Sequence, residues 1–217
     1  SLGLATVASL IAVGLAVVLS YGVRMHDTGF ARVASRVASM GYAIPGSVVA
    51  VGILIPFTWL DNALNTWFNH HYGYIIGLVF SGSAFILLYA YVVRFLAVSF
   101  NAVEASLGKV TPSMDAASRT LGQTAGGTLR HIHTPMMRSS LLAAGILVFV
   151  DVMKELPATI ILRPFNFDTL AVRAHNLASD ERLAEASTSS LAIVVVGILP
   201  VILLSMAMRR SRPGAKS

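Results

Sequence analysis

Three ionisable residues stand inside an otherwise apolar stretch and are the first candidates for chemistry. Asp151, Lys154 and Glu155 interrupt the segment 140–162, which has the length of a membrane span. Charged groups at such depth are costly and normally face protein or water. The spacing of Asp151 and Lys154 puts both on one helical face, where they can form an ion pair. Alternatively, one of the carboxylates lines a polar pathway, and the sequence leaves both interpretations open.

Other polar groups give weaker signals. His70 and His71 are of a type that ligates metals, but adjacent histidines in a loop are more often solvated. A second set of carboxylates follows the segment 140–162 and consists of Asp168, Asp180, Glu181 and Glu185. No cluster has a recognisable metal-ligand spacing, and neither Gly-x-Ser-x-Gly nor His-Glu-x-x-His occurs. We therefore assign no catalytic residue and no metal site.

The composition is that of a membrane protein. The 217 residues are 55% hydrophobic and 12% charged, with a mean hydropathy of +0.73. A soluble domain carries roughly twice that charged fraction. The chain has no cysteine, which excludes disulfides and thiolate metal sites. We expect one all-α integral membrane domain over 1–217 with about five transmembrane helices, at 1–21, 42–60, 74–100, 140–162 and 191–208.

The sequence also predicts details between the second and third spans. The segment 61–72 lacks Lys and Arg and is rich in aromatic residues, as a polar loop at a membrane interface would be. Gly73, Gly77 and Ser81 recur every four residues, which predicts a stripe of small residues suited to close helix packing. Arg94 is expected near the far end of the third span, where its side chain can reach the interface.

The longest polar interval, 101–139, separates the third and fourth spans. Ser113 can cap a first short helix, and Gly122 tolerates the positive φ that a helix end or sharp turn requires. A second short helix is expected to end at Pro135. The first helix has an apolar face at i, i+3 and i+7, made of Met114, Ala117 and Leu121. This pattern predicts a helix–Gly–helix unit that fits a partner's groove, and the alternative is a solvated connecting loop.

Lys and Arg are divided unevenly between the two sides of the membrane. With five crossings, the linker after the first span, the 101–139 loop and the C-terminal tail share one side. That side holds 12 of the 16 Lys and Arg, Arg94 included. Because loops rich in Lys and Arg stay in the cytoplasm, we expect the 101–139 loop and the C-terminus to be cytoplasmic. The net charge of +6 then requires no nucleic acid as a partner.

The 101–139 loop resembles the coupling loop of ATP-driven importer permeases. Its signature there is Glu-Ala-Ala, three residues, Gly, nine residues, Ile, one residue, Leu-Pro. In this chain Ala116 stands at the Glu position, with Asp115 one place earlier, and Thr134 replaces the Leu. The resemblance implies that the loop couples the permease to a cytoplasmic ATPase. The candidate coupling residues are Asp115, Ala116, Ala117, Ser118, Gly122, Ile132 and Pro135.

The stretch 153–187 resembles the corresponding segment of bacterial ferric-iron importer permeases. It contains Lys-Glu-Leu-Pro at 154–157, Leu-Arg-Pro-Phe-Asn-Phe-Asp-Thr-Leu at 162–170 and Ala-Ser-Asp-Glu-Arg at 178–182. The resemblance extends over most of the chain from the third span onward. Such permeases are often single chains with two homologous halves. We find no internal repeat, so this chain looks like a C-terminal half.

The resemblance implies a type I ABC importer permease, which is a pathway protein and not an enzyme. A periplasmic ferric-iron-binding protein would deliver the solute, and a second permease half would complete the pathway in the bacterial inner membrane. A dimer of ATP-binding subunits would use ATP and Mg to drive alternating access, and this chain would bind no cofactor. Ferric iron prefers oxygen ligands. The candidate pathway residues are Asp151, Lys154 and Glu155, and the candidates for docking the binding protein are Asp168, Asp180, Glu181 and Glu185.

Other functions stay open. A permease for another solute, such as thiamine or a polyamine, would share the coupling loop and the architecture. An ATP-independent carrier would show inverted repeats with interrupted helices in matching positions. A membrane-embedded enzyme would need a nucleophile–base or metal constellation. The sequence shows neither of these last two patterns.

Overall fold

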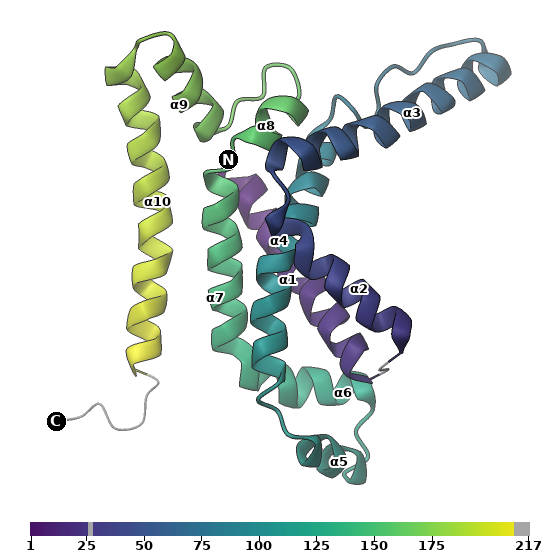
Figure 1. Ribbon diagram of the computed structural model, residues 1–217, viewed down its shortest axis with the longest axis vertical. Helices are drawn as coiled ribbons and strands as arrows, with labels where there is room; N and C mark the ends of the chain where they lie inside the picture. Colours follow the sequence, from purple (N-terminus) through teal and green to yellow (C-terminus); the bar gives the residue numbers. More distant parts are fainter. Residues whose placement is uncertain (26–27, 211–217) are drawn as a thin grey trace.

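The computed structural model describes residues 1–25 and 28–210, and every regular element in that part of the chain is helical (Figure 1). Within this described part, five helical segments are long and apolar enough to cross a membrane. The elements are α1 (Leu2–Met25), α2 (Gly29–Met40), the short 3-10 turn η1 (Gly41–Ala43), α3 (Gly46–Tyr72), α4 (Ala84–Leu107), α5 (Pro112–Thr120), α6 (Ala125–Thr128), the π-helical turn η2 (Leu129–His133), α7 (Thr134–Met153), α8 (Pro157–Leu162), α9 (Leu170–Ser179) and α10 (Leu183–Arg210).

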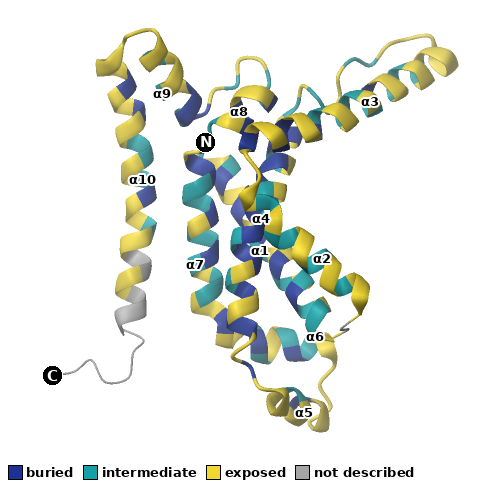
Figure 2. Cartoon of the chain, in the orientation of Figure 1, coloured by how far each residue is buried: buried dark blue, intermediate teal, exposed yellow. Residues whose placement is uncertain are grey.

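The core lies where α1, α4 and α7 pack together. On α1, the fully buried Ala5, Ala8, Ala12 and Ala16 recur every three or four residues. Small side chains on one face let helix backbones approach closely in a membrane, where packing drives association. The approach is close enough for the hydroxyl of Ser99 on α4 to donate to the carbonyl of Ala12, at 3.0 Å. Figure 2 shows the buried residues concentrated along α1, α4 and α7.

Two long helices leave this core. α3 projects away from it (Figure 1) and buries mainly its first two turns, through Val49, Ala50 and Ile53. α10 stands beside α7, and its exposed side chains include Leu191 and Val194. Exposed apolar surface of this kind is compatible with contact to lipid or to another membrane protein.

The expected boundary between the second and third spans is wrong. Residues 61–72 are not a polar loop, because α3 continues to Tyr72 and ends at Gly73, which has a φ of 73°. Residues 74–83 are not helical, so Gly77 and Ser81 belong to no helical stripe.

Polar side chains on α3 explain this difference. The buried carboxylate of Asp61 accepts hydrogen bonds from the backbone N–H groups of residues 79–81, at 2.8 to 3.1 Å. Asn65 exchanges two hydrogen bonds of 2.9 Å with the backbone of Gly77. These side chains satisfy backbone groups that a helix would otherwise pair, so a non-helical segment is stable there.

The 101–139 interval contains more helix than expected. α5 begins after Thr111 with Pro112 in its first turn, so Ser113 is not the N-cap. A second helical run extends from α6 through η2 into α7 without interruption. Pro135 therefore does not end a helix. It lies in the first turn of α7, just after the π-helical turn, where a missing N–H is tolerated.

The fourth apolar segment is two helices. α7 ends at Met153, and Pro157 begins α8 in place of breaking a longer helix. The residues between them, 154–156, include Lys154 and Glu155 and form a discontinuity at the end of the core. Backbone that departs from helix at membrane depth is tolerated where it is buried in protein or lines a cavity.

Candidate functional site

One end of the bundle carries a compact unit, residues 112–128, which we call the knob. It contains α5, a tight turn and α6, and Figure 1 shows it at the end where α4 stops and α7 starts. Gly122 forms the turn with a φ of 77°, as the sequence predicted, and a side chain at this φ would be strained.

The knob exposes its apolar face. Leu121 is 80% exposed and Met114 is 38% exposed, and Ala116 and Ala117 are also exposed. Ser118 faces inward and shares a hydrogen bond of 2.6 Å with Thr128, which ties α5 to α6. An exposed apolar face on an internally bonded unit is a surface suited to a partner protein.

Asp115 is not part of that outer surface. Its Oδ2 accepts from Nε and Nη2 of Arg24, at 3.1 and 2.8 Å, and its Oδ1 lies 2.7 Å from Nε2 of His133. Burial opposes ionisation of Asp115, but the hydrogen bonds and charges of Arg24 and His133 outweigh it and hold the pKa of this carboxyl below its usual range. Asp115 is thus an internal anchor of α5 and not a free charge for a partner.

Arg24 and His133 were missed as site residues by the sequence analysis. Arg24 lies in the last turn of α1. In the sequence it contributes only to the positive charge expected after the first span. His133 is fully buried in the π-helical turn. Since Arg24 is 91 residues from Asp115, no local spacing relates them.

The remaining coupling candidates are placed less centrally. Ile132 is half-buried in the π-helical turn, and Pro135 is exposed at the start of α7. Neither contributes a side chain to the exposed face of α5.

The first pathway candidates form the ion pair that their spacing predicts. Nζ of Lys154 lies 2.9 Å from Oδ1 of Asp151. The Lys154 side chain is 61% exposed and that of Asp151 is 14% exposed. The carboxylate of Asp151 is therefore engaged by the residue that directly follows its own helix.

Glu155 is a separate site with a partner that the sequence did not indicate. Its Oε1 accepts from the N–H of Ala158 at 3.0 Å, and its Oε2 lies 3.6 Å from Nε of Arg94. The prediction that Arg94 reaches the interface from the far end of its span is wrong, because Arg94 lies near the middle of α4 and faces Glu155. Nε and Nη1 of Arg94 are buried and have no hydrogen-bond partner among the described residues.

The start of α3 closes over this pair. A methyl group added to Gly46 would lie 2.0 Å from Nη1 of Arg94 and 2.6 Å from Oε1 of Glu155. A larger residue at position 46 would require the ends of the Arg94 and Glu155 side chains to shift, and Gly46, Arg94 and Glu155 lie together where α3, α4 and the discontinuity before α8 meet. We call these three residues the Arg94 junction.

The acidic residues at the opposite end from the knob are not equivalent. Asp168 forms an ion pair with Arg163, and Glu185 forms one with Arg182. Asp180 and Glu181 lie in the turn between α9 and α10, both exposed. The predicted docking residues therefore do not form one acidic patch of four unpaired carboxylates.

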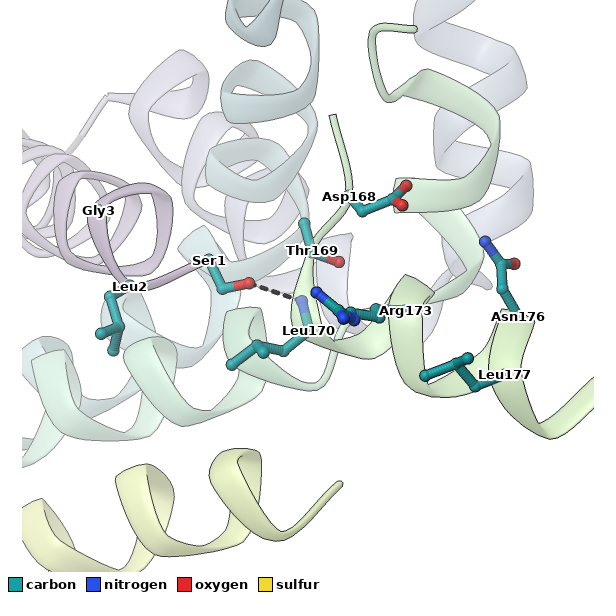
Figure 3. Close-up of a pocket in the computed structure, with 9 residues that line it drawn as sticks. All are labelled: Ser1, Leu2, Gly3, Asp168, Thr169, Leu170, Arg173, Asn176 and Leu177. Carbon is teal, nitrogen blue, oxygen red and sulfur yellow. Dashed lines mark hydrogen bonds between the residues drawn. The ribbon is translucent and has the colours of Figure 1, made fainter. Parts of the chain in front are cut away.

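A polar groove lies beside these residues. Its cavity of about 640 Å³ is bordered by the start of α1 and by α9 (Figure 3). The N–H of Leu170 donates to the hydroxyl of Ser1 at 2.7 Å, and Asp168, Arg173 and Asn176 are among the polar residues that line the groove. No local pattern in the sequence indicates this groove, because its walls come from distant parts of the chain.

The described residues contain no group of three or more His, Asp or Glu side chains placed to hold a metal ion. His70 and His71 lie in the last turn of α3 and not in a loop. The His71 ring stacks on Trp67, and its Nδ1 lies 2.8 Å from the Trp67 carbonyl oxygen.

Comparisons with known sequences identify transport permeases. The chain is 27% identical over 169 residues to the Fe(3+)-transport system permease protein FbpB 2 of Haemophilus influenzae, which covers 78% of the chain and 30% of that protein. It is 26% identical over 216 residues to a putative 2-aminoethylphosphonate transport system permease protein PhnV of Salmonella paratyphi A, covering 100% of the chain and 75% of that protein. The chain thus spans less than a third of the first relative. No protein-family model matches it.

Comparisons with solved structures give the fold. The chain matches a bacterial ABC transporter involved in the import of the acidic polysaccharide alginate, with a TM-score of 0.70 and 13% identity over 97% of this chain and 79% of that one. A structure of the alginate ABC transporter in complex with alginate pentasaccharide-bound periplasmic protein gives a TM-score of 0.74 and 14% identity, over 96% of this chain and 76% of that one. In sequence and in fold, the chain is therefore related to the permeases of ABC importers.

Proposed function

We propose that this chain is part of the membrane permease of an ATP-driven, binding-protein-dependent importer, and that the knob is the surface on which its ATPase docks. The observation that carries the proposal is the knob itself. It presents an exposed apolar face, with Leu121 at 80% exposure, at one end of a bundle of candidate membrane spans. The ATPase would be a cytoplasmic dimer that uses ATP and Mg, and this chain would supply no cofactor site.

The charge distribution supports the orientation that this proposal requires. The ends of α1 and α4, the knob and the start of α7 lie at one end of the bundle (Figure 1), and most of the Lys and Arg belong to the adjoining segments. Arg94 no longer counts toward this bias, but the bias remains without it. The knob and the C-terminus would therefore be cytoplasmic in a bacterial inner membrane, although the end of the tail, 211–217, lies outside the described residues.

The opposite end would face the periplasm and the binding protein. There the polar groove and the exposed turn with Asp180 and Glu181 lie beside each other on α9. Phe165, in the loop between α8 and α9, is 99% exposed and adds an apolar contact point. A second permease half would cover the exposed apolar faces of the bundle.

For the solute we propose ferric iron, on the basis of the resemblance in 153–187 and of the permeases named for Fe(3+) among the relatives. Asp151 and Glu155 are both engaged with cations, so a passing ferric ion would compete with Lys154 and Arg94 for them. Weak, competitive binding suits a pathway, because conduction requires release.

A phosphonate is the second candidate. The relatives named for 2-aminoethylphosphonate align with the full length of the chain. Among the described residues, the buried Nε and Nη1 atoms of Arg94 have no hydrogen-bond partner, and a guanidinium is a strong donor to oxyanions. An oxyanion solute would bind Arg94 and displace Glu155 from it. Ferric iron, in contrast, would bind Glu155 and displace Arg94.

The test is ATP-dependent uptake into proteoliposomes that hold the full permease, its ATPase and its binding protein. Labelled ferric iron and labelled 2-aminoethylphosphonate are supplied separately to the wild type, to Gly122→Arg and to Gly29→Arg. Gly29 is an exposed glycine at the start of α2 with open space around it, and serves as the matched control. We expect Gly122→Arg to abolish uptake and Gly29→Arg to retain it.

Each outcome has a distinct meaning. Normal uptake by Gly122→Arg would refute docking through the knob. Uptake of the phosphonate alone would keep the knob and reject iron as the solute. Uptake without ATP dependence would return the chain to the class of ATP-independent carriers.

A further inference from the structure

Arg24, in the last turn of α1, makes hydrogen bonds that reach α5. Its guanidinium bonds to three separate parts of the chain. Nη1 donates to the carbonyl of Leu107, the last residue of α4, at 2.8 Å, and Nη2 donates to the carbonyl of Val110 at 2.8 Å. Nε and Nη2 also donate to Asp115 on α5. One side chain thus joins the end of α1, the end of α4, the connecting loop and α5.

We propose that Arg24 is a positioning residue that makes α5 move as one body with the inner ends of α1 and α4. This inference rests on the proposed function, in which α5 receives the motion of an ATPase. Without such a connection, α5 would be joined to α4 and α6 only through the short linkers 108–111 and 121–124. A displacement of α5 could then change the conformation of these linkers without moving α1 or α4. With it, the displacement reaches the core helices directly.

The chemistry of the site calls for arginine in particular. A guanidinium presents five N–H donors in a rigid plane, whereas the ammonium of lysine is a single point of attachment. Here three nitrogen atoms make four hydrogen bonds to three acceptors. Two of these bonds pair a guanidinium with a carboxylate, and such charge-assisted bonds are about twice as strong as neutral ones.

Asp115 is held from a second side. His133 approaches Oδ1 with its Nε2 at 2.7 Å, and this residue belongs to the π-helical turn that leads into α7. Tyr21, one turn before Arg24, packs its ring edge-on against His133 at 5.5 Å and donates its hydroxyl to the carbonyl of Ala125 at 2.8 Å. The carboxylate therefore stands between α1 and α7, and both helices start or end at the knob.

Few other side-chain hydrogen bonds connect α5 to the rest of the chain. Within the described part of the chain, the other side-chain hydrogen bonds from α5 to neighbouring elements are that of Ser118 to Thr128 and that between Asp115 and His133. These bonds join α5 to α6 and to the π-helical turn, and not to α1 or α4. The connection between α5 and those two core helices therefore runs through Arg24.

The direct test measures whether α5 and α1 move together. Residues 1–217 contain no cysteine, so a spin-label pair can be placed through Gly22→Cys on α1 and Ser113→Cys on α5, both exposed. Distances are measured by double electron–electron resonance in the full complex with its ATPase, without nucleotide and with ATP trapped. We expect one narrow distance distribution in both states, and in Arg24→Gln a broad distribution that changes between the states.

A functional measurement accompanies the distances. In Arg24→Gln the number of solute molecules imported per ATP hydrolysed should fall about tenfold, within the usual range of coupling between sites. Arg24→Lys should give an intermediate ratio, because it keeps the charge and loses the fork. Arg36→Gln, on the exposed face of α2, removes an equal charge and should match the wild type.

Asp115→Asn keeps the inference testable if Arg24→Gln does not assemble. It should give the same broad distribution and low ratio. The double variant Arg24→Gln/Asp115→Asn should be no worse than the single variants, because each removes the same connection. Narrow distributions and coupling ratios within about twofold of the wild type in both single variants would overturn the inference. If those variants behave in this way while Gly122→Arg abolishes uptake, the knob still docks the ATPase and only the role of Arg24 is wrong.

Discussion

The Arg94 junction makes a quantitative prediction at Gly46, the first residue of α3. In Gly46→Ala the new methyl group would lie 2.0 Å from Nη1 of Arg94. Ordinary van der Waals contact begins near 3.4 Å, so the guanidinium would have to retreat by about 1.4 Å. Its Nε is already 3.6 Å from Oε2 of Glu155, and both side chains are largely buried, so a retreat of Arg94 would disturb this ion pair.

The expected loss of stability follows from two opposing effects. Forcing an extra methyl group into a packed site costs about 1–3 kcal/mol. Replacing glycine by alanine in a helix contributes roughly 0.5–1 kcal/mol in the other direction. We therefore expect Gly46→Ala to lower the free energy of unfolding by about 1–2 kcal/mol. Gly52, one and a half turns further along α3, has nothing within 4 Å of its added methyl group. Gly52→Ala should raise the free energy of unfolding by up to about 1 kcal/mol.

The two substitutions form a matched pair in the same helix. The unfolding of the detergent-purified protein is followed by tryptophan fluorescence, since both tryptophans, Trp59 and Trp67, lie on α3. The difference in unfolding free energy between the two variants should be about 1–3 kcal/mol. Equal stabilities of Gly46→Ala and Gly52→Ala would show that the start of α3 does not close on Arg94, and the junction would have to be abandoned.

Three further predictions concern other buried contacts. Asp61→Asn should increase amide hydrogen exchange at residues 79–81, measured by mass spectrometry. The reason is that an amide side chain has one acceptor oxygen for the three N–H donors that the carboxylate now accepts. Unchanged exchange would contradict the role of Asp61. Gly41→Ala should lower the unfolding free energy by about 1–3 kcal/mol. Its methyl group would lie 2.6 Å from the backbone oxygen of Val93, which cannot move as a side chain can. A denaturant midpoint equal to that of the wild type would show that η1 does not pack so closely on α4. The lowered pKa of Asp115 means that its stabilising effect is present above its ordinary pKa of 3.8 and is lost as the pH falls through the lower folded value. Asp115→Asn should therefore be less stable than the wild type at pH 7, and the difference in melting temperature should shrink below pH 4; a difference that grows in acid would contradict this sign.

Local sequence patterns predicted the features that depend on a few neighbouring residues. Apolar runs of span length gave the helical class and the approximate position of the long helices, because a membrane requires about 20 apolar residues in a helix. The positive φ at Gly122 and the pair of Asp151 with Lys154 were predicted for the same reason. A turn type and an i, i+3 pair are set by backbone geometry within one turn.

Boundaries were less predictable where a polar side chain replaces a backbone partner. Residues 74–83 are apolar enough to read as the start of a span, yet they are not helical, because Asp61 and Asn65 bond to their backbone. The same two residues were assigned to a loop because they are polar, although they lie inside α3. Hydropathy measures the transfer of side chains and contains no information on which backbone group a side chain will meet.

By itself, then, the sequence determined that this chain is a helical membrane protein with a glycine-hinged knob between two spans. Tertiary structure alone decided which charges meet: Arg94 with Glu155, and Arg24 and His133 with Asp115. The physical reason is that a buried charge must find a partner wherever the packed helices bring one within reach, at any separation along the chain. Apolar periodicity specifies which faces pack, but the partners on those faces are fixed only once the helices are placed against one another.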